Sequence, residues 1–205
     1  MQSSAGVTNG VLEIRWHGRG GQGAISSARI LAEAAYRGGC LGVTSAPSFG
    51  AERRGAPVTA STRLSEKPLR IFSQIETPDM VVVLDESLLT CANPLAGLAE
   101  SGMVIVNSRQ APDTLGLPDD IAIVTADATG AAKEAGLVVS GTIMVNTAML
   151  GAVVRVAPHA TLETLWMAFE ASFPPDAARV NYEAARLTYE RTQCNERAGE
   201  MCSCA

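Results

Sequence analysis

A glycine-rich segment near the N-terminus constrains the fold more than any other feature of this sequence. Residues 11–17 alternate apolar and polar side chains, which is typical of a short β-strand. Gly18, Gly20 and Gly23 follow at once, and Ala24–Arg37 then repeats small apolar residues at helical spacing. Strand, glycine loop and helix in this order form the opening unit of a dinucleotide-binding type of α/β fold.

The loop is predicted to bind a phosphate group. Its backbone can approach an anion closely, and the following helix directs its free N–H groups at the loop. The candidate binding residues are Gly18, Arg19, Gly20, Gly21, Gln22 and Gly23. A nicotinamide dinucleotide also requires an acidic residue at the end of the second strand, about 20 residues further on. That strand, predicted over Cys40–Ala46, ends in serine, alanine and proline, so the sequence disfavours a stand-alone NAD(P)-binding oxidoreductase without removing it as an alternative.

A second loop, Pro47–Pro57, contains an arginine pair between two glycines. Its candidate ligand-binding residues are Ser48, Glu52, Arg53, Arg54 and Gly55. Arginine forks suit phosphate oxygens, and we expect this loop to converge with the glycine loop at the carboxyl ends of adjacent strands. The alternative is that the arginines pair with Glu52 or with a neighbouring subunit.

The remaining sequence alternates buried strands and helices before it becomes helical. Strands are expected over Val58–Leu64, Leu69–Phe72, Met80–Leu84, Met103–Asn107 and Ile121–Val124, the first two as a hairpin. Helices are expected over Glu86–Cys91 with Asp85 as the cap, Pro94–Glu100, Asp127 or Thr129 to Gly136, Ile143–Val156, Thr161–Ser172 and Asp176–Gln193.

These elements predict a three-layer α/β fold: a mostly parallel, Rossmann-like sheet with helices on both faces and a C-terminal helical segment. One domain over residues 11–192 is expected. A disordered N-terminus, 1–10, precedes it, and a cysteine-containing tail, 193–205, follows.

Composition narrows the function classes. The net charge of −5 argues against nucleic-acid binding. There is no secretory signal pattern, and the longest apolar run is too short to cross a bilayer, so a cytoplasmic protein without a membrane partner is expected. The five cysteines are expected to be thiols. Cys194, Cys202 and Cys204 belong either to a disordered tail or to a metal or cluster contact completed by a partner chain.

Catalytic groups are scarce. There is no Walker lysine, no H-E-x-x-H and no Cys/His triad. His17 either hydrogen-bonds a phosphate or packs at the strand end, and His159 is expected at the surface. Capping explains Asp79 and Asp85 more simply than acid–base chemistry. A binding surface is therefore a stronger prediction than a catalytic site, and no residue is assigned a catalytic or metal-binding role.

Several segments resemble the gamma subunit of 2-oxoacid:ferredoxin oxidoreductases. They are His17–Gly23, Ser48–Val58, Lys67–Arg70, Pro78–Asp85 and Val145–Ala152, and the similarity extends over about residues 11–190. The run Glu52–Pro57 resembles the pyruvate and branched-chain 2-oxoacid branch more than the 2-oxoglutarate branch. The tail after about Arg191 departs from the family pattern.

The resemblance implies a non-catalytic subunit of a complex with alpha, beta and delta-type subunits. Such a complex oxidatively decarboxylates a 2-oxoacid, here most simply pyruvate, with coenzyme A and passes electrons to ferredoxin. Thiamine diphosphate, Mg²⁺ and 4Fe–4S clusters are expected on the partner subunits. The gamma chain is expected to cover the active site and help hold coenzyme A; a purely structural assembly role is the other alternative.

Overall fold

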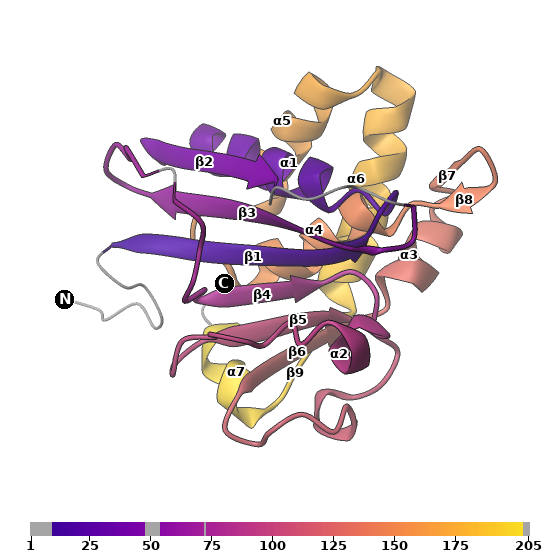
Figure 1. The fold of residues 1–205 in the computed structure, drawn as a ribbon. Helices are drawn as coiled ribbons and strands as arrows, with labels where there is room; N and C mark the ends of the chain where they lie inside the picture. The colour runs from indigo at the N-terminus through magenta and orange to yellow at the C-terminus, as the bar shows by residue number, and fades with distance from the viewer. Residues whose placement is uncertain (1–9, 48–53, 72, 203–205) are drawn as a thin grey trace.

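The computed structural model describes residues 10–47, 54–71 and 73–202, which fold around one mixed sheet (Figure 1). Its strand order is β2-β3-β1-β4-β5-β6-β9. The strands are β1 Val11–Arg19, β2 Gly42–Pro47, β3 Pro57–Ser65, β4 Met80–Val83, β5 Met103–Asn107, β6 Ala122–Ala126 and β9 Gln193–Cys194. β1, β4, β5 and β6 pair in parallel and β2 runs in the same direction, whereas β3 and β9 are antiparallel to their neighbours.

The helices confirm the helical part of the prediction at most positions. They are α1 Ala24–Arg37, α2 Leu88–Cys91, a 3₁₀ turn Pro112–Thr114, α3 Ala128–Glu134, α4 Val145–Val156, α5 Leu162–Ser172, α6 Pro175–Glu190 and α7 Glu196–Cys202. Asp127 caps α3 by accepting from the Gly130 N–H at 2.7 Å. α4 is buried on nearly every side, as its uniformly apolar sequence predicts. The fold class is thus confirmed.

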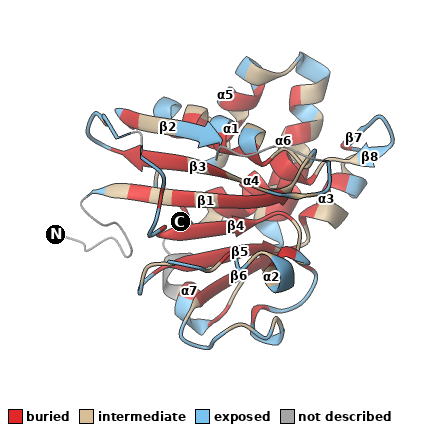
Figure 2. Ribbon diagram, viewed as in Figure 1, coloured by how far each residue is buried: buried red, intermediate tan, exposed pale blue. Residues whose placement is uncertain are grey.

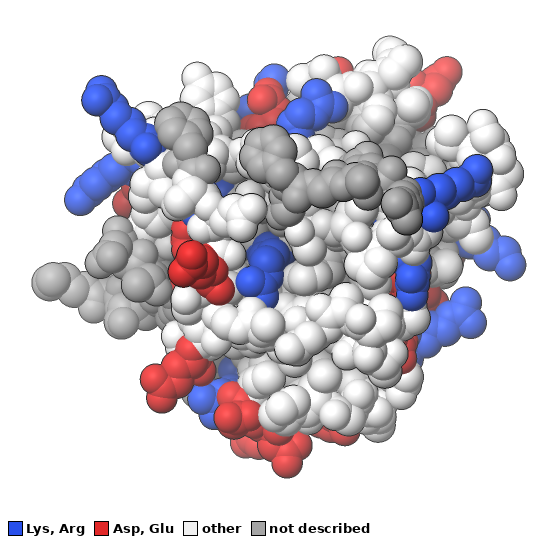
Figure 3. All heavy atoms as spheres, viewed as in Figure 1, with Lys and Arg blue, Asp and Glu red and all other residues white. Residues whose placement is uncertain are grey.

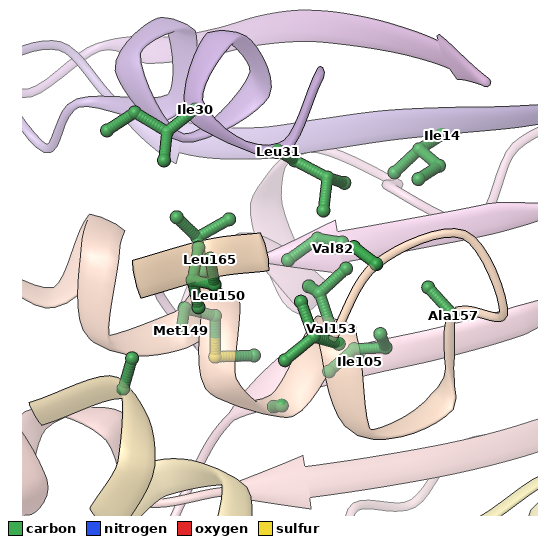
Figure 4. Close-up of a cluster of buried hydrophobic side chains, with 14 of the residues drawn as sticks. Ile14, Ile30, Leu31, Val82, Ile105, Met149, Leu150, Val153, Ala157 and Leu165 are labelled. Carbon is green, nitrogen blue, oxygen red and sulfur yellow. The ribbon is translucent and has the colours of Figure 1, made fainter. Parts of the chain in front are cut away.

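Two clusters of buried apolar side chains of unequal size cover the two faces of the sheet. Figure 2 shows that the central strands β1, β4 and β5 are largely buried. On one face, α1 and α4 cover the sheet, and Ile14, Val82 and Ile105 point from the strands into the main core, while α5 packs against α1 and α6 (Figure 4). On the other face, Val81, Val83, Val104 and Val106 are covered by α2 and by the irregular segments that follow it. The strands are buried on both faces, which explains their continuous apolar sequences.

The predicted hairpin between Val58–Leu64 and Leu69–Phe72 is wrong. β3 pairs instead with β1 on one side and β2 on the other, and residues 69–71 form no strand; residue 72 lies outside the described residues. A long antiparallel strand can find partners far away in sequence, and the turn residues after Ser65 do not reveal which partner wins.

Three further expectations are corrected at element ends. Residues 94–100 form turns because Asn93 and Gly97 adopt positive φ values of 42° and 74°, which a helix cannot accommodate. α2 is shorter than predicted, and Ser87 rather than Asp85 is its first flanking residue. α6 ends at Glu190 rather than Gln193. The two-stranded ribbon β7 Val138–Val139 with β8 Thr142–Ile143 was not predicted, and Ile143, expected to begin a helix, belongs to it, because α4 starts at Val145.

The expectation of a disordered tail is wrong for residues 193–202. β9 pairs with β6 through Val124 and Thr125, and α7 follows it. Asn195 fastens this segment because its Oδ1 accepts from the Ile123 N–H and its Nδ2 donates to the Ile121 carbonyl, both at 3.0 Å. Cys194 is disulfide-bonded, which corrects the expectation of thiols throughout, while Cys40 and Cys91 are free. The predicted disorder of residues 1–10 falls almost wholly outside the described residues.

Within the described part of the chain, no helix is long and apolar enough to span a membrane.

Candidate ligand site at the glycine loop

The two predicted loops meet. Gly20 forms an isolated parallel bridge with Arg54, its N–H donates to the Ala56 carbonyl at 2.8 Å, and its own carbonyl accepts from the Gly55 N–H at 3.1 Å. The two strands that lead into the loops, β1 and β2, were predicted to be adjacent. They are not, because β3 lies between them. Convergence is nevertheless confirmed for Arg54 and Gly55, because the second loop runs directly into β3, whose Pro57 pairs with Arg19.

A carboxylate holds the glycine loop in place. Asp85 Oδ2 accepts from Arg19 Nε at 3.1 Å and from Gln22 Nε2 at 3.0 Å. Asp85 Oδ1 accepts from the N–H of Ser87 at 3.1 Å and also from its hydroxyl. Despite the opposing effect of partial burial, the hydrogen bonds from Ser87 and Gln22 and the positive charge of Arg19 lower the pKa of Asp85 below its usual value. The charged form of Asp85 therefore braces the loop.

Arg19 also joins the two loops. Its Nη1 donates to the Gly55 carbonyl at 3.1 Å and its Nη2 to the Ser87 hydroxyl at 2.6 Å. The Arg19 N–H donates to Gln22 Oε1 at 2.7 Å, which closes the turn. With its guanidinium committed to these acceptors, Arg19 acts here as a structural brace.

Arg54 has a different environment. Its side chain is exposed and has no hydrogen bond or ion pair with another described residue. Ser48, Glu52 and Arg53 lie outside the described residues, so the alternative pairing with Glu52 is untested. On the face drawn in Figure 3, the described Lys and Arg side chains are scattered rather than gathered in one basic patch. Arg54 is thus an available cation beside the glycine loop.

Helix α1 begins at the loop without a side-chain cap. Gly23 adopts φ 82° at the N-cap position, and no acidic residue lies in the first turn. A Cβ at Gly23 would lie 2.4 Å from Asn146 Nδ2, so only glycine fits. Because no side chain caps them, the first-turn N–H groups of α1 keep hydrogen-bonding capacity toward an anion.

Buried polar contacts set the position of α1. Trp16 Nε1 donates to Thr62 Oγ1 at 2.9 Å, and the Thr62 hydroxyl donates to the Ala28 carbonyl at 3.1 Å. On the opposite side, the Ser27 hydroxyl donates to the Asn146 carbonyl at 3.0 Å. These contacts lock the helix between the sheet and α4, which fixes where its N-terminus points.

A cavity of about 340 Å³ opens beside the loop at the carboxyl ends of β4 and β5. The residues that line it are Gly21, Gln22, Leu84, Asp85, Glu86, Asn107, Thr129, Thr142, Ile143, Met144 and Val145. This edge of a doubly wound sheet is where such folds bind ligands. Among the described residues, this lining contains two carboxylates and no lysine or arginine.

His17 packs rather than facing a ligand. It is 7% exposed on β1, and its Nε2 accepts from Arg15 Nε at 3.2 Å. Burial, reinforced by the neighbouring Arg15 charge, lowers the pKa of His17 to about 4. Its imidazole is therefore neutral at pH 7. The prediction for His159 is wrong in part, because that residue is half-buried and its Nδ1 has no hydrogen-bond partner among the described residues.

The sheet order also bears on the nicotinamide alternative. In the dinucleotide fold, the acid that holds the ribose follows the second strand of the chain, which pairs with the first strand on the side away from the fourth. Here that neighbour is the antiparallel β3, and the displaced β2 ends in Ala46 and Pro47. The ribose-binding acid of that fold thus has no counterpart at this position.

The sequence did not reveal the roles of three residues of the site. Asp85 was interpreted as a helix cap and Glu86 as part of a helix, and Asn146 was assigned no role. The available signals were the position of Asp85 at the end of a buried strand and the presence of an amide in a mostly apolar run. Within the described ranges, no group of three or more His, Cys, Asp or Glu side chains could hold a metal ion.

Comparisons with known proteins agree on one family. Residues 13–191 match the family model described as pyruvate ferredoxin/flavodoxin oxidoreductase. The chain is 46% identical over 191 residues to the pyruvate/ketoisovalerate oxidoreductases common subunit gamma of Pyrococcus abyssi, covering 91% of this chain and 100% of that protein. It is 42% identical to pyruvate synthase subunit PorC of Methanothermobacter thermautotrophicus, covering 89% of this chain and 97% of the relative.

Solved structures share the fold. The pyruvate oxidoreductase subunit PORC of Thermotoga maritima is 37% identical with a TM-score of 0.79, covering 92% of this chain and 100% of that one. A 2-oxoglutarate:ferredoxin oxidoreductase of Magnetococcus marinus, solved with coenzyme A bound, is 20% identical with a TM-score of 0.67. It matches 97% of this chain but only 32% of its own, so the same fold also occurs as one part of a longer chain. The chain therefore belongs to the pyruvate ferredoxin/flavodoxin oxidoreductase family and, within it, to the gamma subunits.

Proposed function

We propose that this chain is the gamma subunit of a multi-subunit, coenzyme A-dependent 2-oxoacid:ferredoxin oxidoreductase that acts on pyruvate. Alpha, beta and delta-type subunits are its partners, and they carry thiamine diphosphate, Mg²⁺ and the 4Fe–4S clusters. The complex converts the 2-oxoacid to an acyl-CoA and passes electrons to ferredoxin. The relatives named for pyruvate and ketoisovalerate support this substrate class.

Within that complex, the gamma chain covers the active site and binds the phosphates of coenzyme A. The observation that carries this proposal is the bridge between Gly20 and Arg54, because Arg54 is exposed, has no hydrogen bond or ion pair with another described residue, and pairs with the glycine loop that opens the uncapped helix α1. Loop N–H groups, the helix N-terminus and an arginine fork together suit a phosphate. In this proposal Gly18 to Gly23 supply the backbone, Arg19 braces it, and Arg54 and Gly55 lie against Gly20. Ser48, Glu52 and Arg53, which lie outside the described residues, are proposed to contribute to the same phosphate site.

Replacement of both Arg53 and Arg54 by alanine in the assembled complex tests this role. The apparent KM for coenzyme A is expected to rise about tenfold, because two charge-assisted contacts to phosphate are lost. The KM for pyruvate is expected to stay within a factor of two in the same viologen-linked assay. Arg109→Ala is the matched control, since Arg109 is an exposed arginine that pairs with Asp127. Unchanged coenzyme A kinetics in the double variant would instead favour a purely structural assembly subunit.

A further inference from the structure

The small ribbon β7–β8 projects from the body of the chain and carries apolar side chains (Figure 1). Val138 and Val139 are 49% and 55% exposed, and the sequence from Gly136 to Val145 contains no charged residue. A two-stranded ribbon this short is marginally stable in water unless something packs against it. Its adjacent exposed valines therefore indicate a surface that another chain covers.

The turn of the ribbon fixes its shape. Ser140 and Gly141 connect the paired residues Val139 and Thr142, and both have positive φ values, 49° and 79°. Two positive φ values in a two-residue connection are typical of the type I′ turn, whose twist matches that of the flanking strands. The ribbon is thus ordered before a partner arrives, which lowers the entropy cost of binding.

A mainly apolar cavity of about 360 Å³ opens between the ribbon and the start of α6. Val138, Val139 and Met144 contribute to it from the ribbon and the segment that follows, and Phe173 and Val180 contribute from the other side. No residue of the glycine loop lines it, although Met144 also lines the cavity beside that loop. The exposed valines therefore belong to a concave surface that is separate from the glycine loop.

This cavity has one buried acceptor without a donor. Asn146 is 6% exposed, and its Oδ1 has no hydrogen-bond partner among the described residues. Its Nδ2 is the amide atom nearest to the position of a Cβ on Gly23, so Oδ1 occupies the other arm of the amide. Asn146 lines this cavity and not the one beside the glycine loop. Because a buried carbonyl oxygen without a donor is unfavourable, the cavity favours an occupant that supplies one.

The other polar side chains of the lining offer less to an occupant. Thr147 Oγ1 donates to Asn181 Oδ1 at 2.5 Å, and Asn181 Nδ2 donates to the Ala177 carbonyl at 2.8 Å. The charged residue of this lining, Asp176, has a side chain that is 98% exposed and pairs with Arg179 at 3.5 Å, so its carboxylate lies at the mouth. The interior therefore combines apolar walls with a single open acceptor.

We propose that this cavity receives a tryptophan side chain from another subunit of the complex, with the indole N–H donating to Asn146 Oδ1. Tryptophan combines a large apolar ring with one N–H donor and no acceptor, and a buried indole N–H usually has a partner. It is also among the side chains that most often anchor protein interfaces in desolvated pockets. The assignment rests on the proposed assembly with alpha, beta and delta-type subunits.

Small probes test the chemistry of the cavity on the full-length purified chain. Amide NMR shifts of ¹⁵N-labelled protein are followed during titration with indole and with 1-methylindole, which cannot donate. Indole is expected to shift the N–H signals of Val139 and Ala177, and 1-methylindole is expected to bind about tenfold more weakly because the hydrogen bond is lost. In Asn146→Ala the ratio of the two Kd values should fall to about one. Equal Kd values in the unmodified chain, or shifts confined to other parts of the chain, would overturn the assignment.

Assembly tests the surface without depending on Asn146. Val139→Asp places a carboxylate on the apolar surface, so the Kd of the gamma chain for the co-expressed alpha, beta and delta-type subunits is expected to rise at least tenfold. Leu41→Asp is the matched control, because Leu41 precedes β2 and is 65% exposed. It should assemble like the unmodified chain, and circular dichroism should show both variants folded. Normal assembly of Val139→Asp would remove the inference.

The coenzyme A kinetics separate this inference from the proposed function. Complex that still forms with Val139→Asp should keep the KM for coenzyme A, whereas the Arg53 and Arg54 replacements should raise it without weakening assembly. Normal assembly of Val139→Asp together with a raised KM in the arginine variant removes the docking surface alone. If the unmodified chain does not assemble with these subunits, the proposed function and this inference both fail.

Discussion

Helix α1 starts at a glycine that has no side-chain cap, whereas α5 starts at a threonine whose side chain completes a capping box. At α5, Thr161 Oγ1 accepts from the Thr164 N–H at 3.2 Å, and Thr164 Oγ1 accepts from the Thr161 N–H at 2.9 Å. Every contact of that cap lies within four consecutive residues. At α1, the start is shaped by Asp85 through Gln22 and by the side chain of Asn146 against Gly23.

This difference distinguishes two ways in which the N-terminus of a helix can be held. A local cap satisfies one of the free N–H groups of the first turn, so fewer of them remain for a ligand. A glycine start held by distant residues is rigid as well, but its N–H groups stay available. The α1 junction is therefore suited to binding and the α5 junction to stability, and substitutions at the two should have different effects.

The largest effect is expected from Gly23→Ala. Alanine would have to hold φ 82°, and its Cβ would overlap Asn146 Nδ2 at 2.4 Å. Backbone strain and overpacking together should lower the free energy of unfolding by about 3 kcal/mol, measured by urea denaturation of the purified chain. Gly21→Ala is the matched control: φ is 93° but no atom lies within 4 Å, so only about 1 kcal/mol should be lost. Equal losses in the two variants would show that Asn146 does not set this position.

A pH-dependent effect of similar size is expected from His17, just before the loop. Its pKa of about 4 in the folded chain lies below the ordinary value of 6.5, so between these values the unfolded chain binds a proton that the folded chain does not. The free energy of unfolding should therefore fall as the pH decreases from 6.5 to 4, by about 3 kcal/mol. Above pH 6.5 this contribution is constant. His17→Asn should lose this slope in urea titrations between pH 4 and 7, keeping only what other groups contribute, including His159, whose pKa burial also lowers.

A smaller change is expected when the loop brace is weakened. Asp85→Asn removes the charge that holds Arg19 and Gln22 and should lower the free energy of unfolding by about 1 kcal/mol, since the pair is partly exposed. The KM for coenzyme A should rise severalfold with kcat unchanged, because the loop is less well ordered. Asp176→Asn serves as the control, since its ion pair with Arg179 is almost fully exposed and should contribute almost nothing. A change in kcat alone would contradict a positioning role.

The smallest functional effect is expected at α5. Thr161→Ala removes one half of the capping box and should lower the free energy of unfolding by about 1 kcal/mol. The KM for coenzyme A should not change, because no residue of α5 lines the cavity beside the glycine loop. Thermal denaturation together with the viologen-linked assay checks both statements. A raised KM in this variant would mean that the two junctions are coupled.

Local patterns predicted most elements correctly. The alternation in residues 11–17 and the mostly apolar run of α4 each indicate an environment that short-range periodicity already requires. The convergence of the two loops was also predicted, from the rule that carboxyl ends of strands share one edge. The errors fell on Leu69–Phe72, Pro94–Glu100 and the tail, where pairing over a long sequence distance or positive φ values decide the conformation.

The sequence by itself determined the α/β class, the glycine loop that opens a helix, and the family, because these depend on residue types at fixed local spacing. Only the tertiary structure decided that β3 separates β1 from β2 and that Arg19 binds Asp85. It also decided that, among the described residues, Arg54 has no side-chain partner and Glu86 Oε2 has no donor. These outcomes depend on which distant partner occupies each donor and acceptor. Many arrangements satisfy the same local pattern, and the packing of the whole chain selects one of them.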